Sequence, residues 1–255
     1  KTEDLPDRPP AKKVQLPKSN TPFKSSYDRL NESSAPVVLY NLLNKDLARF
    51  LGDIEIKPKG SLVITLDSPA GGGKTHTTFQ VAQAFAESGY KPIIWSLEEH
   101  CDSGLSKNKQ NDYFNEKTQR IVSVESDDSD LSNEENFDRV IESIKYFDVI
   151  LVDSWTKLQE LNSKISIDQH FRKKFDGKLF LFIFQRTGDG KMRGGSKNEF
   201  DGDIILKVAV FPDFKNNYIY NVKNRYNDLP LLELKFSPFY RELINTESEE
   251  IVLEG

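Results

Sequence analysis

The sequence is poor in cysteine and in long apolar runs, and each absence excludes a class of protein. Cys101 is the single cysteine among 255 residues, which excludes a disulfide framework and any zinc site built from cysteines. No run approaches the roughly 18 apolar residues of a membrane-spanning helix, and the first residues lack the pattern of a signal peptide. We therefore expect a soluble protein of a reducing, cytoplasmic compartment that has no membrane partner.

The chain also lacks an excess of basic residues. Its 35 Lys and Arg against 40 Asp and Glu give a formal net charge of −5. This charge argues against a uniformly basic coat for nucleic acid, but it leaves room for a local basic loop. Much of the negative charge lies in the stretch ESDDSDLSNEE at 125–135, which we interpret as a solvated loop.

Composition divides the chain into three segments. Residues 1–35 are rich in Pro, Ser, Lys and Asp with few apolar positions, so we expect a linker or arm. Residues 36–240 are long enough to bury the core of one domain, which is predicted to begin with a helix over 36–51. Residues 241–255 are predicted to be a tail.

The pattern from residue 61 onward alternates strands and helices. Apolar runs such as VILVD and LFLFIF are typical of central strands in a parallel sheet. The remaining strands have no long helix between them, which predicts an antiparallel extension. The fold class is therefore α/β, a mostly parallel twisted sheet flanked by helices with a C-terminal antiparallel extension. The predicted strands are 61–67, 92–97, 120–124, 148–153, 178–184, 203–211, 217–223 and 231–236, and the predicted helices are 74–88, 134–146 and a polar stretch at 103–118.

The stretch SLVITLDSPAGGGKT at 61–75 runs from a strand through a glycine-rich turn into a helix. Consecutive glycines let backbone N–H groups turn inward as a cradle for an anion, and the helix adds its positive end. Lys74 is placed to reach the β- and γ-phosphates of ATP, and the Thr75 hydroxyl to bind the accompanying Mg²⁺. The usual pattern is GxxxxGK[ST], and Ser68 stands at its first glycine. The alternative, a chance Gly-Lys-Thr in a surface turn, does not account for the flanking strand and helix. The predicted nucleotide-binding residues are Ser68, Pro69, Ala70, Gly71, Gly72, Gly73, Lys74, Thr75 and His76.

Polar residues follow three other apolar strands, at the edge where ligands bind in parallel sheets. Asp153 ends VILVD, where a carboxylate can hold Mg²⁺. Glu98 and Glu99 end PIIWSLEE, and we favour Glu98 as the base that activates the attacking water, because Ser154 rather than glutamate follows Asp153. Gln185 ends LFLFIFQ and is either a sensor of the γ-phosphate or a partner of the local backbone.

Two basic clusters lie in the last third of the chain. The glycine-rich stretch RTGDGKMRGGSKNEFDGD is either a loop that contacts the phosphate backbone of DNA or an ordinary surface loop. Lys223 and Arg225 lie two residues apart on a predicted strand and hence on one face, where they either reach a neighbouring copy's triphosphate or are merely solvated. The candidate DNA-binding residues are Arg186, Lys191, Arg193 and Lys197.

Together, the segments PKGSLVITLDSPAGGGKT, IIWSLEEH, VILVDS, LFIFQ and VKNRY resemble the RecA-like ATPase superfamily, in particular the branch of RadA/Sms proteins and DnaB-type helicases. The resemblance covers about residues 54–236. It implies that Lys223 and Arg225 act across a subunit boundary, as in the KNRFG motif of RadA, although Tyr226 and Asn227 replace its Phe-Gly. The zinc module and protease-like domain of RadA and the amino-terminal helical domain of DnaB are not in this sequence. Single-domain relatives occur in phages and mobile elements.

These features lead to a specific functional hypothesis. We expect an ATP- and Mg²⁺-dependent, DNA-dependent ATPase, a helicase or recombination motor, that forms a homo-oligomeric ring or filament, with a hexamer as the expected size, and binds single-stranded DNA. Its catalytic residues would be Lys74, Glu98, Gln185, Lys223 and Arg225. The alternative is a KaiC-like assembly or signalling ATPase that does not bind DNA, which the acidic net charge favours. A small-molecule kinase is a weaker alternative, since no acceptor-binding lid is evident.

Overall fold

The computed structural model describes residues 22–31, 36–185, 201–231 and 233–244. The chain divides into two compact units, Lys1–Pro36 and Val37–Gly255. In the first unit, the described residues include the short helix α1 (Ser26–Asn31), which buries no side chain. In the described part of the chain, no helix is both long and apolar enough to cross a membrane.

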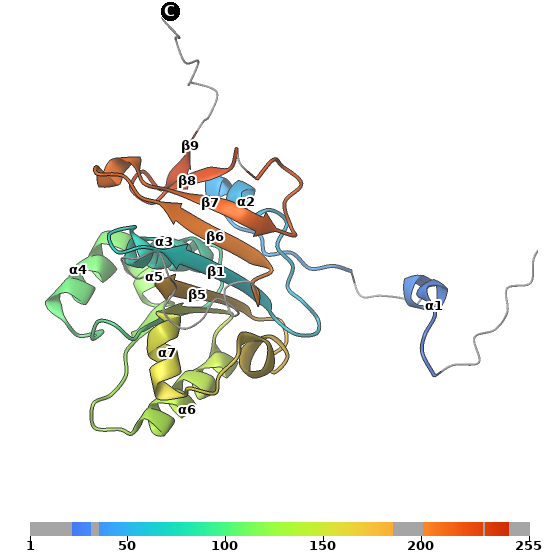
Figure 1. Cartoon of the computed structure of the whole chain (residues 1–255), viewed down its shortest axis with the longest axis horizontal. Helices are drawn as coiled ribbons and strands as arrows, with labels where there is room; N and C mark the ends of the chain where they lie inside the picture. The colour runs from blue at the N-terminus through green and yellow to red at the C-terminus, as the bar shows by residue number, and fades with distance from the viewer. Residues whose placement is uncertain (1–21, 32–35, 186–200, 232, 245–255) are drawn as a thin grey trace, which may run out of the picture. The chain divides into compact units, whose positions relative to one another are not determined.

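The second unit is built on a nine-stranded sheet in the order β3-β2-β4-β5-β1-β6-β7-β8-β9 (Figure 1). The strands from β3 to β6 in this order are parallel, and β7, β8 and β9 continue the sheet in antiparallel fashion. The prediction of a mostly parallel sheet with an antiparallel C-terminal extension is confirmed, and the extension begins at β7 because β6 still pairs parallel with β1. The strands are β1 (Leu62–Ser68), β2 (Pro92–Ser96), β3 (Ser123–Glu125), β4 (Val149–Asp153), β5 (Leu179–Gln185), β6 (Ile204–Ala209), β7 (Tyr218–Asn224), β8 (Lys235–Ser237) and β9 (Glu242–Ile244).

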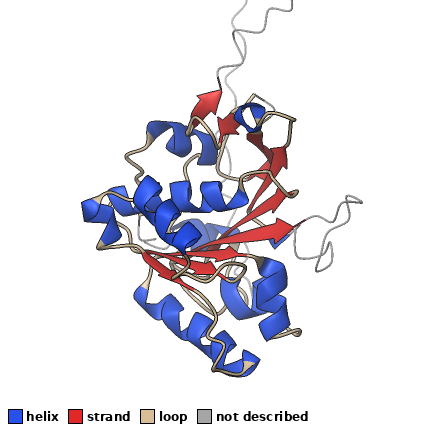
Figure 2. Cartoon of the chain, turned by 90° about the vertical axis from the view of Figure 1, so that its left-hand side faces the viewer, coloured by secondary structure: helices blue, strands red, loops and turns tan. Residues whose placement is uncertain are grey.

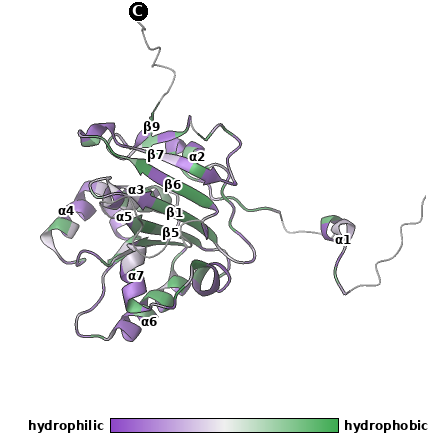
Figure 3. Cartoon of the chain, in the orientation of Figure 1, coloured by the Kyte–Doolittle hydropathy of each residue, from purple (hydrophilic) through white to green (hydrophobic). Residues whose placement is uncertain are grey.

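Helices cover both faces of this sheet (Figure 2). On one face, α2 (Lys45–Leu51) and α3 (Lys74–Glu87) pack on alternate residues of β1, such as Leu62 and Ile64. On the other face, α6 (Asn133–Ser143) and α7 (Trp155–Leu161) share an apolar cluster with the intervening residue Val63 of β1 and with Phe182 of β5. Two apolar cores result, one on each face, which is why the central strands are mostly apolar, with polar residues such as Asp67 and Asp153 near their ends (Figure 3).

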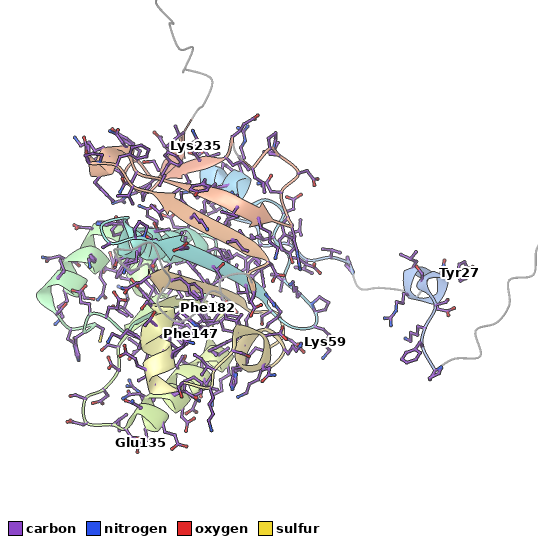
Figure 4. All side chains as sticks on the ribbon, viewed as in Figure 1. Tyr27, Lys59, Glu135, Phe147, Phe182 and Lys235 are labelled. Carbon is purple, nitrogen blue, oxygen red and sulfur yellow. The ribbon has the colours of Figure 1, made fainter. Side chains whose placement is uncertain are left out.

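Aromatic rings fill the second core. Phe182 is fully buried and lies in the interior in Figure 4, whereas Lys235 of β8 lies at the surface. The Trp155 ring packs edge-on against Phe182, with ring centroids 5.0 Å apart, and against Phe171 at 6.1 Å. Each buried aromatic ring removes a large apolar area from water, so this cluster holds α7 and the turn at Asp168–Arg172 onto the sheet.

Several predicted elements differ in extent. Only the last part of the helix predicted over 36–51 is helical, because Asn44 caps α2 by accepting a hydrogen bond from the Leu47 N–H at 2.9 Å. The preceding residues are extended, and Leu39 pairs with Glu55 in an antiparallel bridge. The predicted stretch 103–118 forms two helices, α4 (Gly104–Tyr113) and α5 (Glu116–Gln119).

The predicted tail also departs from expectation. Its residues Glu242–Ile244 form β9, which pairs with β8. The strand was missed because three residues carry too short a pattern to signal a strand on their own. Helix α7 was not predicted either, since its seven residues follow a buried strand without an obvious break.

Candidate active site

The glycine-rich turn between β1 and α3 has a backbone that only glycine can adopt. Gly71 and Gly73 have positive φ angles of 75° and 86°, in the left-handed region that disfavours other residues. At Gly72, an added Cβ would lie 2.3 Å from the Ser68 hydroxyl oxygen. The turn therefore stays open as a cradle at the positive end of α3, the geometry that binds phosphate.

The residues predicted to contact the nucleotide surround this cradle. Ser68 is buried at the end of β1 and pairs with Gln185 of β5, whereas Pro69 and Ala70 form the more exposed part of the turn. Lys74 and Thr75 begin α3. The structure thus gathers the whole predicted set at one end of β1.

Glu98 lies between Lys74 of α3 and Gln185 of β5. Its Oε2 lies 3.4 Å from Lys74 Nζ, and its Oε1 accepts a hydrogen bond from Gln185 Nε2. The side chains of Lys74 and Glu98 are only 15% and 29% exposed, so their charges interact more strongly than they would in open water. The three side chains come from the start of α3, the residues after β2 and the end of β5. They meet beyond the ends of these strands.

Glu99, the other candidate base, points elsewhere. Its two carboxylate oxygens accept hydrogen bonds from Ser103 Oγ at 2.7 Å and Lys109 Nζ at 2.8 Å, both on or next to α4. Partial burial acts to raise the pKa of Glu99, but these hydrogen bonds outweigh it and hold the pKa below its ordinary value. Glu99 is therefore fastened to α4, whereas the partners of Glu98, Lys74 and Gln185, lie at the cradle and at the end of β5.

Asp153 and Thr75 present oxygen atoms to a common point. Thr75 Oγ1 donates a hydrogen bond of 3.1 Å to Asp153 Oδ2. Among the described residues, none donates to Oδ1, although the side chain is buried. Burial raises the pKa of Asp153 to about 6, while the nearby Lys74 charge opposes that rise. A buried carboxylate oxygen without a partner, beside a hydroxyl, fits Mg²⁺, which prefers oxygen ligands.

His76 and the residues around it close the outer side of the turn. The His76 ring Nδ1 hydrogen-bonds the Tyr113 hydroxyl of α4, and the ring centroid lies 5.6 Å from that of Phe214. Burial and the charge of Lys109 lower the pKa of His76, which favours the neutral imidazole. A neutral ring adds no charge to the site. The positive charge at the start of α3 therefore comes from Lys74.

Lys223 and Arg225 lie at the opposite end of the sheet. Lys223 Nζ donates to the Gly202 carbonyl oxygen at 2.7 Å, and burial lowers the pKa of Lys223, with the Arg225 charge adding to the effect. Arg225 follows β7 rather than lying on it, and its side chain is 64% exposed. The β7 residues Lys223 and Asn224 pair with the start of β6, which runs parallel to β1, whereas the cradle follows the end of β1. Ile204, the partner of Asn224, pairs with Ile64, four residues or about 13 Å before the end of β1. Both side chains contact residues that precede β6, Gly202 and Asp203, so neither cation reaches phosphates in its own cradle.

A buried carboxylate that the sequence analysis missed holds this second cluster together. Asp203 is 3% exposed and lies 3.0 Å from Lys57 Nζ, 3.4 Å from Arg225 Nη1 and 3.7 Å from Arg172 Nη2. Its Oδ2 also accepts a hydrogen bond from the Val63 N–H at 3.1 Å. An aspartate directly before the apolar run IILKVA was the available signal, but its three cations are distant in the sequence.

The four basic residues predicted to contact DNA, Arg186, Lys191, Arg193 and Lys197, lie outside the described residues. The residues on either side of that segment, Gln185 and Asp201, are described. Gln185 ends β5 beside the cradle, and Asp201 precedes the turn that Lys223 contacts.

Comparison with known proteins shows which fold this architecture resembles. No protein-family model and no curated protein matches the sequence significantly. Among solved structures, the flagellar accessory protein FlaH from Methanocaldococcus jannaschii matches with a TM-score of 0.58 and 15% identity, over 79% of this chain and 94% of that one. The fold is RecA-like. The KaiC-like protein PH0186 from Pyrococcus horikoshii OT3 matches with a TM-score of 0.56 and 15% identity, over 83% of this chain and 99% of that one. At this identity the likeness shows the RecA-like fold alone.

Proposed function

We propose that the chain is an ATP hydrolase that works as an assembly, in which Lys223 and Arg225 of one copy complete the nucleotide site of the next. One observation carries the proposal. The groups that we assign to phosphate binding and hydrolysis lie at one end of β1, whereas the two cations of the VKNRY segment contact Gly202 and Asp203, which precede β6, toward the other end. A ring or filament of copies arranged head to tail brings the two ends together.

The cradle would bind the triphosphate through its backbone N–H groups and Lys74. In the structure, Lys74 Nζ faces Glu98. A bound γ-phosphate would compete for that ammonium and so release the Glu98 carboxylate to accept a proton. Mg²⁺, held by Thr75 and Asp153, would offset the negative charge that develops on the phosphate oxygens.

Hydrolysis then follows from the position of Glu98. Its carboxylate would accept a proton from a water molecule as the water oxygen attacks the γ-phosphorus, and the bond to the bridging β,γ-oxygen breaks to leave ADP. Gln185 would hold the second carboxylate oxygen of Glu98 and exchange this bond for one to the γ-phosphate or the attacking water. Lys223 and Arg225 from the adjoining copy would stabilise the charge of the transition state.

We further propose that single-stranded DNA stimulates this ATPase through Arg186, Lys191, Arg193 and Lys197. What supports this is their sequence, four cations in a glycine-rich stretch that connects Gln185 to the turn contacted by Lys223. The second candidate function is a KaiC-like ATPase that regulates a protein partner without binding DNA. The likeness to the KaiC-like protein and the net charge of −5 favour it.

Steady-state ATP hydrolysis, measured against protein concentration with and without single-stranded DNA, tests these proposals. Turnover per subunit that rises with concentration supports the shared site, and a further rise with DNA supports the DNA-dependent motor. Activity that rises with concentration but ignores DNA favours the KaiC-like candidate. Turnover that is independent of concentration contradicts the completion of the site by a neighbour. The Lys74→Ala variant, which should bind no ATP, is the control for contaminating activity.

A further inference from the structure

Aromatic side chains continue outward from the phosphate cradle. The Phe214 ring lies so close to Gly73 that an added Cβ there would be 2.8 Å from Phe214 Cε2. The Phe214 centroid is 6.1 Å from that of Phe239, which in turn is 4.9 Å from that of Tyr240. We call these three residues the aromatic ridge. It begins at the cradle and ends at the surface.

The order of strands decides which part of a nucleotide would meet this ridge. Glu98, Asp153 and Gln185 follow or end β2, β4 and β5, which all lie on one side of β1. Strands β6, β7 and β8 lie on the other side (Figure 1). A triphosphate whose γ-phosphate faces Glu98 and Gln185 therefore directs its nucleoside away from β5 and toward β6, β7 and β8.

The ridge lies on that nucleoside side. Phe214 is in the connection between β6 and β7, and Phe239 and Tyr240 are in the turn between β8 and β9. The connection is tied to the cradle because Asn217 Nδ2 donates to the Gly71 carbonyl oxygen at 3.3 Å. Its position relative to the cradle is therefore defined by a direct contact.

The ridge also has the surface chemistry that a base needs. Phe239 is 41% exposed and Tyr240 57% exposed, so aromatic area remains open beside the cradle. Lys215 Nζ lies over the Phe239 ring, 5.5 Å from its centroid. Nucleic-acid bases stack on aromatic rings of this kind, with cations contributing at the π-face.

We propose that the aromatic ridge binds the base of the nucleoside triphosphate held by the cradle, with Phe239 as the main stacking surface. This inference rests on the proposed function, because it requires a triphosphate in the cradle. Stacking uses the π-face that every base possesses, so the ridge distinguishes a nucleotide from a bare phosphate chain rather than one base from another.

The test compares the binding of Mg²⁺-ATP with that of Mg²⁺-tripolyphosphate by calorimetry, in the full chain and in the Phe239→Ala variant. Loss of one stacking contact weakens binding about tenfold to a hundredfold. We expect that loss for ATP, with the affinity for tripolyphosphate unchanged. Phe239→Trp should retain the ATP affinity. The control is Tyr146→Ala, which removes an aromatic ring that is 62% exposed and lies next to α6, away from the cradle.

Three outcomes would overturn the inference. An unchanged ATP affinity in Phe239→Ala, with or without a change in assembly, would mean that the ridge serves another purpose, such as contact between copies. An equal loss for ATP and tripolyphosphate would mean that Phe239 shapes the cradle. If the unmodified chain binds neither ligand, both the proposed function and this inference fail. In the first two outcomes, only this inference fails.

Discussion

Replacing Asp203 by asparagine should destabilise the domain far more than a typical surface substitution. The carboxylate is almost fully buried and faces three cations, Lys57, Arg172 and Arg225. Asparagine keeps nearly the same shape and can still accept the Val63 N–H. The substitution therefore removes the negative charge alone. Lys57 and Arg225 lose the carboxylate that they contact, whereas Arg172 keeps an ion pair with Asp168 at 3.4 Å.

The magnitude follows from how buried each cation is. Removing one partner of a buried ion pair costs about 3–5 kcal/mol. The side chains of Lys57 and Arg172 are 20% and 22% exposed, so partial hydration moves the expected cost to the lower end of that range. Arg225 is 64% exposed and adds little, because water screens it. We expect a loss of about 3 kcal/mol in the free energy of unfolding, which corresponds to a fall in Tm of about 6–12 °C for a domain of this size.

Urea unfolding and a thermal melt of the Asp203→Asn variant measure this loss. The matched control is Glu116→Gln, which removes a carboxylate from an ion pair with Arg120 whose side chains are 86% and 75% exposed, and which should cost less than about 1 kcal/mol. If the two variants lose the same small amount of stability, the Asp203 cluster is not the electrostatic anchor inferred from its geometry.

Three further predictions concern the active site. Glu98→Gln should keep ATP affinity but lower turnover by about a hundredfold or more, while Glu99→Gln retains turnover; the reverse result in single-turnover hydrolysis would move the base to Glu99. Arg225→Ala mixed into unmodified protein should depress ATPase activity by more than its mole fraction, because each variant copy spoils a neighbour's site, and strictly proportional loss would contradict that. Burial raises the pKa of Asp153 to about 6 in the folded state. Without Mg²⁺, the protonated carboxyl therefore stabilises the folded state at low pH, and this stabilisation is lost as the pH rises from about 4 through about 6. Asp153→Asn should accordingly be more stable than the unmodified chain at pH 7.5 in chelator, and equal or lower stability in denaturant titrations would count against the burial of an unpartnered carboxylate.

The elements that the sequence predicted well are those with a strong local signal. The run at Leu62–Ser68, the three glycines after it and the apolar face of α3 together specify a strand, a phosphate-binding turn and a helix without reference to the rest of the chain. Elements with a weak local signal were not predicted, because their own residues do not specify a structure. The extended residues around Leu39 are held by a bridge to Glu55, and β9 is held by β8, so neither could be recognised from its own residues.

The sequence by itself determined the α/β class, the phosphate cradle and the identity of the polar residues that follow the central strands, because each depends on neighbours within a few positions. Only the tertiary structure decided how these residues meet. The placement of β5 between β1 and β4 brings Gln185 to Glu98, and hydrogen bonds from Ser103 and Lys109 hold Glu99 at α4. The compensation of Asp203 likewise depends on tertiary structure, because Lys57 lies 146 residues before it in the sequence and Arg225 lies 22 residues after it. Strand order and long-range ion pairs depend on the packing of the whole sheet, and no local pattern encodes them.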